Sequence, residues 1–278
     1  MDWKEFISQS LSEDIREGDH TSLSTISEGE QGGAILWAKA NGIVAGVELA
    51  QMIFWEYDSL LDVKVFMPDG SEIKHGDKIL EVTGEERSIL SCERLVLNCM
   101  QRMSGIATLT NQFVKAVEGT AAKILDTRKT SPLFRAAEKW AVKIGGGENH
   151  RFGLYDMILI KDNHVDYAGG IRASIEKANH YLEEKKLSLP IEIETRSIDE
   201  VKEVLSVGKV NRIMLDNFSP GKIIEALKLI DKKFETEVSG GITLKNIRSY
   251  AETGVDFISV GALTHSALSL DLSLKAVK

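Results

Sequence analysis

The chain has 278 residues, of which 43% are hydrophobic, so it can bury the core of a large α/β barrel or of a barrel with a smaller companion domain. Its formal net charge of −8 argues against a nucleic-acid partner, because such proteins usually carry a broad basic face. No run of about 18 apolar residues is present, and the start MDWKEFISQS carries charges where a signal peptide needs an apolar stretch. We therefore expect a cytoplasmic protein with no membrane association.

The first part of the chain, residues 1–105, is predicted to form an α+β domain. Its pattern favours a helix over residues 2–11, β-rich segments over 33–46 and 63–84, and a second helix over 86–103. Cys92 and Cys99 lie seven positions apart in that second helix, which is the spacing of two buried small side chains. No other cluster offers them metal ligands, so we predict that both are structural thiols.

The second part, residues 106–265, alternates β-like runs with helix-compatible stretches. The expected strands lie at 122–127, 156–161, 191–195, 212–216, 237–241 and 257–262. Such alternation indicates parallel strands joined by crossover helices. There are fewer strands than a closed (β/α) barrel needs, so we predict an α/β fold with an incomplete barrel of about six parallel strands. An open, doubly wound sheet is the alternative, and the tail at 266–278 is expected to pack back on the first domain.

Nearly every predicted strand ends in a polar residue or a glycine. These residues are Asp126, Arg128, Lys161, Glu194, Asp216, Ser239, Gly240, Gly241 and Gly261. Because the carboxyl ends of parallel strands meet at one rim, where barrel enzymes place their chemistry, we expect these residues to converge. The glycine-containing segments after the last two strands, SGGIT and SVGALTHS, are expected to bind phosphate through backbone N–H groups.

Cationic side chains gather between Asp126 and His164, although the chain as a whole is acidic. They are Arg128, Lys129, His150, Arg151, Lys161 and His164. Arginine offers carboxylate or phosphate a planar fork, and lysine offers a mobile point charge. A single arginine or lysine is most often a solvated surface charge, but so many at strand ends favour a functional interpretation. We predict a site for a small ligand with several anionic groups.

Several strings in order along the chain resemble one family. They are DTRKT, GGGENHRFGLYDMILIKDNH, IEIE, MLDNFSP, the segment 239–266 and the terminal LDLSL. This set is similar to nicotinate-nucleotide pyrophosphorylase (carboxylating), also called quinolinate phosphoribosyltransferase, most densely from Glu93 onward. The resemblance implies that quinolinate and phosphoribosyl pyrophosphate react, with magnesium, to give nicotinate mononucleotide, pyrophosphate and carbon dioxide in de novo NAD biosynthesis. It also implies a homodimer in which each subunit completes the site of the other, and it allows a higher oligomer.

The resemblance assigns roles to individual positions of this chain. It places quinolinate against Arg128, Lys129, His150, Arg151 and Lys161, with Arg94 reaching in from the other subunit. It places the ribose and magnesium against Glu194 and Asp216, which hold the metal directly or through water, and the 5′-phosphate against Ser239, Gly240, Gly241, Gly261 and Ala262. The physical chemistry agrees, because guanidinium groups suit adjacent carboxylates and carboxylates suit a hard cation.

Some positions allow a second interpretation. Glu192 precedes Glu194 by two residues, so it points the same way along the strand, and Glu194 is preferred because it lies nearer the strand end. His150 can also be read as a helix cap or as a partner of a backbone carbonyl. Where relatives commonly read TTPG, this chain reads TSPL, with Ser131 and Leu133, so we expect a stiffer loop and unchanged chemistry.

Other functions remain open at this point. Related proteins of molybdenum loci share the fold and part of the cationic set, but KDNH and Arg94 favour the quinolinate enzyme. A Schiff-base aldolase would use Lys161 or Lys129, although the neighbouring arginines and the lack of a paired base make this less natural. A non-catalytic phosphosugar-binding protein would not need Glu194 and Asp216 beside a polyanion. A sister enzyme would take nicotinate in place of quinolinate.

Overall fold

A computed structural model describes residues 2–277, which form two compact units. Unit 1 comprises the chain up to Asn111, Ser131–Gly146 and the chain from Ser266 onward; unit 2 comprises Gln112–Thr130 and Gly147–His265. Across residues 2–277, no helix is both long enough and apolar enough to cross a membrane.

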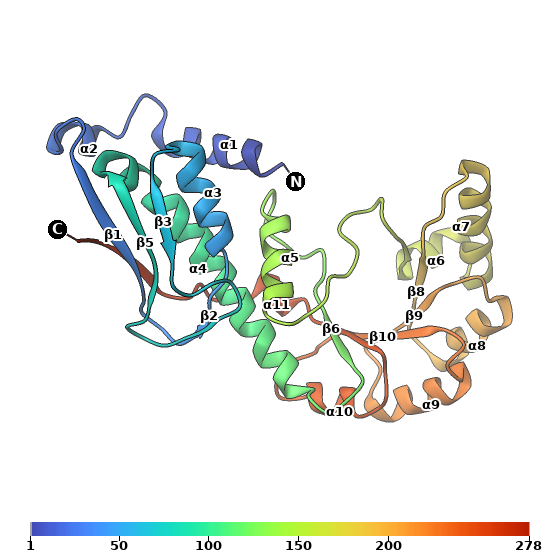
Figure 1. Ribbon diagram of the computed structural model, residues 1–278. Helices are drawn as coiled ribbons and strands as arrows, with labels where there is room; N and C mark the ends of the chain where they lie inside the picture. Colours follow the sequence, from blue (N-terminus) through green and yellow to red (C-terminus); the bar gives the residue numbers. More distant parts are fainter. Residues whose placement is uncertain (1, 278) are drawn as a thin grey trace. The chain divides into compact units, whose positions relative to one another are not determined.

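Unit 1 combines an antiparallel sheet with helices. Its helices are α1 (Trp3–Ile15), α2 (His20–Thr25), α3 (Val47–Tyr57), α4 (Glu86–Ala116, which continues into unit 2) and α5 (Arg135–Ile144). Its strands are β1 (Gln31–Ala38), β2 (Gly42–Ile43), β3 (Asp62–Val65), β4 (Glu72–Ile73), β5 (Lys78–Glu85) and β12 (Leu272–Val277). The main sheet has the order β12-β1-β5-β3, and β2 pairs with β4 (Figure 1). The last strand of the chain thus lies beside the first, with Leu274 opposite Leu36.

The long helix α4 buries one face through apolar residues spaced three or four apart, including Cys92, Val96, Cys99 and Met103. The prediction for the two cysteines is confirmed, because both are free and buried. Burial raises the pKa of each thiol to about 12. Neither sulfur is therefore ionised or reactive at neutral pH.

The segment 131–146 belongs to unit 1, whereas the prediction included it in the barrel domain. The physical reason is a buried ion pair. Glu138 of α5 is fully buried and accepts hydrogen bonds from Arg102 of α4 at 2.8 and 3.0 Å. Arg102 also donates to the carbonyl of Ala267 at 2.6 Å, which ties the C-terminal segment to the same helix. The expected boundary at residue 105 falls inside α4, because this helix is continuous through it.

The loop before α5 contains a leucine in the left-handed region. Leu133 has φ 59° and its side chain is 82% exposed, so it gains little from packing. A leucine in this region costs about 1–2 kcal/mol, whereas glycine adopts it freely but loses more entropy on folding. We expect Leu133→Gly to raise the free energy of unfolding of unit 1 by about 0.5–1 kcal/mol, measured by urea denaturation. Leu133→Ala keeps the strained Cβ and should not raise the free energy of unfolding. Equal stabilisation by the two substitutions would contradict the argument.

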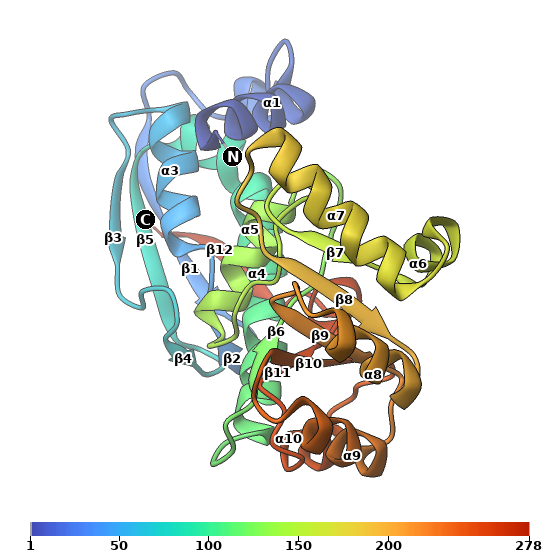
Figure 2. The same cartoon turned by 90° about the vertical axis from the view of Figure 1, so that its right-hand side faces the viewer.

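Unit 2 is built from parallel strands and crossover helices. Its strands are β6 (Lys123–Leu125), β7 (Ile158–Ile160), β8 (Ile191–Thr195), β9 (Arg212–Asp216), β10 (Glu235–Ser239) and β11 (Phe257–Ser259). Its helices are α6 (Asp162–Ala168), α7 (Ile171–Lys185), α8 (Ile198–Val207), α9 (Pro220–Ile230), α10 (Ile247–Ala251) and α11 (Ala262–His265). All strand pairs in this sheet are parallel. Figures 1 and 2 show α7, α8 and α9 along the outer side of the strands.

The strand order decides between the two predicted architectures. The order is β6-β11-β10-β9-β8-β7, so each strand from β7 to β11 lies beside the next one along the chain. A doubly wound sheet would reverse its winding in the middle, so that alternative is wrong. Within the described part of the chain β6 and β7 do not pair, which leaves the ring open between them. The prediction of an incomplete barrel with six parallel strands is confirmed.

Candidate functional site

A cavity of about 590 Å³ lies at the carboxyl ends of the unit 2 strands. Its lining consists entirely of unit 2 residues. The predicted residues that line it are Arg128, Lys129, His150, Arg151, Lys161, Glu194, Asp216, Ser239 and Gly240. Predicted cations and carboxylates from five segments of the chain therefore surround one cavity.

Four predicted residues lie elsewhere. Gly261 and Ala262, at the start of α11, and Gly241 are outside the cavity lining. Gly261 still borders the site, because a methyl group there would meet the Lys129 side chain at 3.2 Å. Arg94 belongs to unit 1, on α4, where it is exposed. The roles assigned to these residues stay predictions.

The cavity also has lining residues that the sequence interpretation did not select. They are Thr127, Leu159, Asp162, Met214, Asn217, Glu237 and Ser259. The alternation of side chains along a strand could have identified four of them. Each precedes a selected residue by two positions and so faces the same side of the sheet: Leu159, Met214, Glu237 and Ser259.

One wall of the cavity is cationic. Burial lowers the pKa of Arg151, and the nearby Arg128 charge lowers it further. Nε of Arg128 is buried and has no hydrogen-bond partner within residues 2–277. Two guanidinium groups that repel each other, one with an unused donor, favour the binding of an anion that would satisfy both.

Two carboxylates of the cavity, Glu194 and Asp216, lie close to each other. Burial raises the pKa of Glu194, and the charge of Asp216 raises it further, whereas Lys161 lowers it. Asp216 accepts a hydrogen bond from the Ser239 hydroxyl at 2.6 Å, which fixes its orientation. Two carboxylates that repel each other suit a bound cation with oxygen ligands, so the donor set fits magnesium.

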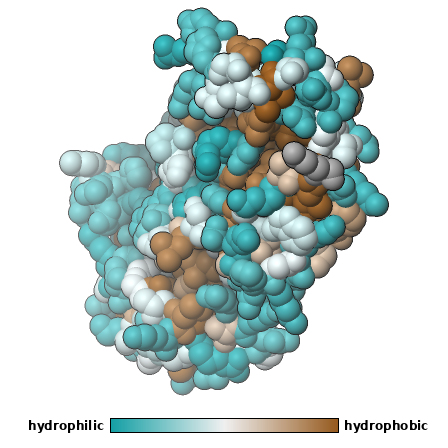
Figure 3. All heavy atoms as spheres, turned by 90° about the vertical axis from the view of Figure 1, so that its left-hand side faces the viewer, coloured by the Kyte–Doolittle hydropathy of each residue, from teal (hydrophilic) through white to brown (hydrophobic). Residues whose placement is uncertain are grey.

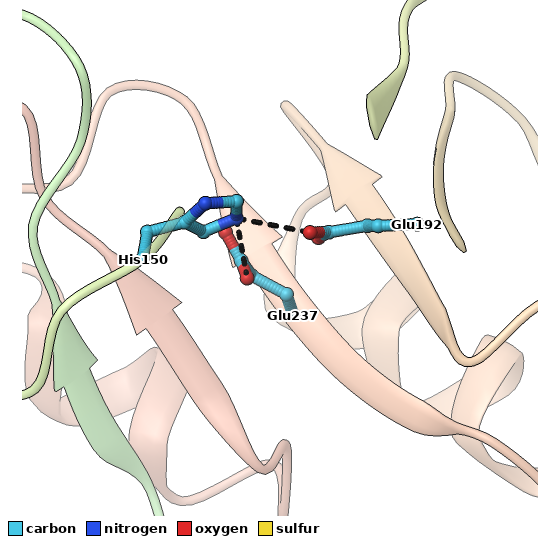
Figure 4. Close-up of side chains that lie close together, drawn as sticks. All are labelled: His150, Glu192 and Glu237. Carbon is cyan, nitrogen blue, oxygen red and sulfur yellow. Dashed lines mark hydrogen bonds and ion pairs between the residues drawn. The ribbon is translucent and has the colours of Figure 1, made fainter. Parts of the chain in front are cut away.

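Beneath these groups lies a buried cluster formed by His150, Glu192 and Glu237 (Figure 4). Nε2 of His150 lies 2.9 Å from Oε2 of Glu192 and 3.4 Å from Oε2 of Glu237. Both glutamates are fully buried. Arg212 donates to Glu237 at 2.9 Å, and its guanidinium lies 4.0 Å from the centre of the Phe257 ring. The cluster thus pairs two buried carboxylates with one arginine and one imidazole.

The charges of this cluster depend on one another. Burial lowers the pKa of His150, but the hydrogen bonds to Glu192 and Glu237 act in the opposite direction and raise it. Burial raises the pKa of Glu192 to about 7, and the charge of Glu237 contributes. The backbone N–H of Arg151 donates to Nδ1 of His150 at 2.7 Å and so opposes a second proton on the ring. We take this contact to define the tautomer, with the ring proton on Nε2 facing Glu192.

A larger hollow, of about 1140 Å³, lies at the other ends of the strands. It is lined by residues such as Asn211, Lys228, Lys233 and Asp256. Its lining contains carboxylates and lysines but no arginine, whereas the smaller cavity has Arg128 and Arg151. Barrel enzymes also place their chemistry at the carboxyl ends of the strands. We therefore assign the functional site to the smaller cavity.

The fold and the cavity together define a class: parallel α/β barrel proteins that bind a small polyanion at the strand ends. Comparison with known proteins identifies the family within this class. The models of the quinolinate phosphoribosyl transferase N-terminal and C-terminal domains match residues 19–104 and 106–275. The chain belongs to the quinolinate phosphoribosyltransferase family, and the resemblance drawn from its sequence is confirmed.

Individual relatives are similar over nearly the whole chain. A quinolinate phosphoribosyltransferase (decarboxylating) of Nicotiana glauca, named as mitochondrial, is 47% identical over 99% of this chain and 82% of its own length. A probable nicotinate-nucleotide pyrophosphorylase (carboxylating) of Bacillus subtilis is 41% identical over 98% of this chain and 92% of its own. The crystal structure of NadC from Streptococcus pyogenes matches with a TM-score of 0.92 and 36% identity, over 99% of this chain and 96% of that one.

Proposed function

We propose that the protein is a quinolinate phosphoribosyltransferase of de novo NAD biosynthesis. It converts quinolinate and phosphoribosyl pyrophosphate to nicotinate mononucleotide, pyrophosphate and carbon dioxide. The observation that carries this proposal is the single cavity in which Arg128, Arg151 and Lys161 lie together with Glu194 and Asp216. Such a cavity offers cations to a diacid and carboxylates to a metal-bound sugar, and the family membership fixes the reaction.

The cationic wall binds the pyridine diacid. Quinolinate carries two adjacent carboxylates. Arg128 and Arg151 can each bind one of them through two parallel hydrogen bonds, and Lys129 and Lys161 add positive charge. The free Nε–H of Arg128 is one donor available for this purpose. Holding both carboxylates fixes the ring in its plane and turns the ring nitrogen toward the sugar.

The reaction needs no nucleophile from the protein. The lone pair of the pyridine nitrogen forms a bond to the anomeric carbon while the bond to pyrophosphate breaks, which leaves a positively charged ring. The bond between C2 and its carboxylate then breaks, carbon dioxide leaves, and the electron pair stays on C2, where the ring nitrogen stabilises it. A proton then adds to C2. Positioning and electrostatic stabilisation supply the catalysis.

Glu194 and Asp216 are proposed to hold magnesium, directly or through water, and to face the ribose. When bound, the ion would neutralise the pyrophosphate. The two carboxylates would also stabilise positive charge that develops on the sugar. The 5′-phosphate is assigned to the segments after β10 and β11. The assigned residues are Ser239, Gly240, Gly241, Gly261 and Ala262.

A homodimer is part of the proposal, with Arg94 of one subunit completing the site of the other. Unit 1 exposes large apolar side chains, among them Trp55 at 70% and Leu60 at 87%. Figure 3 shows hydrophobic patches that reach the surface among hydrophilic residues on one face of the molecule. Exposed apolar patches of this kind are typical of contacts between proteins. A cytoplasmic location stays a prediction; plant relatives are named for mitochondria or chloroplasts.

The test of the proposed function is a direct assay. Purified protein mixed with quinolinate, phosphoribosyl pyrophosphate and magnesium should form nicotinate mononucleotide and carbon dioxide in equal amounts, and chelation of the metal should abolish the reaction. Turnover of nicotinate without quinolinate turnover would instead assign the sister activity. Trapping of a carbonyl substrate on Lys161 or Lys129 by borohydride would assign a Schiff-base aldolase. Binding of the phosphosugar without turnover would indicate a non-catalytic role.

A further inference from the structure

Two buried carboxyl oxygens below the cavity are unexplained by the proposed function. Oε1 of Glu192 and Oε1 of Glu237 have no hydrogen-bond partner among the atoms that the structure describes, and both side chains are fully buried. Burying two acidic groups side by side is costly, because each charge loses its hydration and repels the other. The contacts of the pair show which groups offset this cost.

The printed contacts show what the pair touches. Oε2 of Glu192 lies 2.9 Å from Nε2 of His150, and Oε2 of Glu237 lies 3.4 Å from the same nitrogen. On the other side of the ring, Nδ1 accepts the backbone N–H of Arg151 at 2.7 Å. The backbone N–H of His150 itself donates to Asp126 at 2.9 Å. The imidazole therefore links the buried carboxylates to the backbone of a cavity-lining arginine.

We propose that Glu192 and Glu237 are positioning residues that act through His150 to set the quinolinate-binding end of the cavity. They hold the ring in one orientation with its proton on Nε2, so that Nδ1 accepts the Arg151 N–H. That hydrogen bond fixes the backbone from which the Arg151 guanidinium reaches the ligand. This inference rests on the proposed function, because it assigns the two glutamates to quinolinate binding rather than to the phosphosugar.

A metal ion in the same place is the competing explanation, since His150, Glu192 and Glu237 offer three ligand atoms within 4.8 Å of one another. The neighbouring Arg212 argues against it. Its guanidinium already neutralises Glu237 at 2.9 Å, so a divalent ion would add positive charge beside a buried cation. Arg212 donates to Glu237 and the imidazole N–H faces Glu192, so each carboxylate has a hydrogen-bond donor without a metal.

The test is a double-mutant cycle on the steady-state kinetics of both substrates. Glu192→Leu removes the acceptor for Nε2 and should raise KM for quinolinate about 10- to 100-fold, the range seen when an outer partner of a functional histidine is lost. KM for phosphoribosyl pyrophosphate should stay within about twofold. In the His150→Ala background the same change should have no further effect on KM for quinolinate, because the histidine through which Glu192 acts is gone.

A second variant and a control protect the test from a folding artefact. Glu237→Gln keeps the volume of the side chain and should raise KM for quinolinate less than Glu192→Leu, again only while His150 is present. Asp256→Asn removes a carboxylate that accepts from the Thr236 hydroxyl at 2.6 Å, at the opposite ends of the strands, and should leave both KM values unchanged.

Each remaining result has one meaning. The positioning role is wrong, while the proposed function stands, if the wild-type protein turns over quinolinate but neither glutamate variant changes KM for quinolinate. The same conclusion follows if the effects of Glu192→Leu and His150→Ala on that KM simply add. If the wild-type protein does not turn over quinolinate, the proposed function fails first. One equivalent of divalent metal in the purified protein that is lost in Glu192→Leu would replace the positioning role by a metal site.

Discussion

Replacing Arg128 by alanine is expected to lower kcat/KM for quinolinate by about 100- to 1,000-fold. Arg128 lines the cavity with a buried, unused Nε–H donor, and removing one partner of a desolvated charge pair costs about 3–4 kcal/mol. The loss should appear mainly with quinolinate, because the phosphosugar is assigned to the other side of the cavity. Steady-state kinetics with each substrate varied in turn measures the effect, and size-exclusion chromatography should show an unchanged assembly.

A matched control is available on the outer surface of the same unit. Arg172 on α7 is exposed, pairs with Glu176 at 3.6 Å and is not in the cavity lining, so Arg172→Ala removes the same type of side chain outside the site. Its kinetics should stay within about twofold of the wild type, since exposed ion pairs contribute little. Unchanged quinolinate kinetics in Arg128→Ala would remove Arg128 from the site.

Mixing two inactive variants is expected to restore activity. Arg94→Ala and Lys161→Ala should each be nearly inactive, because the first lacks the arginine supplied across the dimer and the second lacks a cation of the cavity itself. After unfolding and refolding together, half of the dimers would contain one chain of each kind. Each mixed dimer has one intact site, so the mixture should regain about a quarter of the wild-type turnover.

The control for this experiment is a pair of variants whose substitutions both lie in the cavity of their own chain. Lys161→Ala mixed with Arg151→Ala should give no recovery, because both residues belong to the cavity of a single chain and no mixed site is intact. Mass spectrometry of differently tagged chains shows whether mixed dimers form. Mixed dimers without activity in the Arg94 and Lys161 pair would contradict a shared site.

The sequence was sufficient for the parts of the site that follow from strand periodicity. Because polar residues stand where each parallel strand ends, Glu194, Asp216 and Ser239 were placed at one rim, and the structure brings them to one cavity. The same periodicity put Glu192 and Glu194 on one face. It did not reveal that Glu192 lies one layer deeper and is fully buried, because depth depends on how neighbouring strands are staggered.

Contacts between segments that are distant in the chain could not be predicted from the sequence. His150 precedes β7, Glu192 lies in β8 and Glu237 in β10, and only the curved arrangement of the parallel strands brings them to one point. The place of α5 was missed for a related reason. The alternation of α5 with strands favoured the barrel, but the charge of Glu138 is satisfied by Arg102, and both residues belong to unit 1. A buried charge follows its partner rather than the local pattern.

The pairing of β1 with β12 has a consequence for how the protein is made. Residues 39–271 separate β1 from its neighbour β12, so β1 leaves the ribosome long before β12 is made. Until then the first sheet carries an unpaired edge, and such an edge invites pairing with a second nascent chain. Unit 2 has no such delay, because all of its strands precede β12 in the chain. Deletion of β12 would leave that edge open permanently.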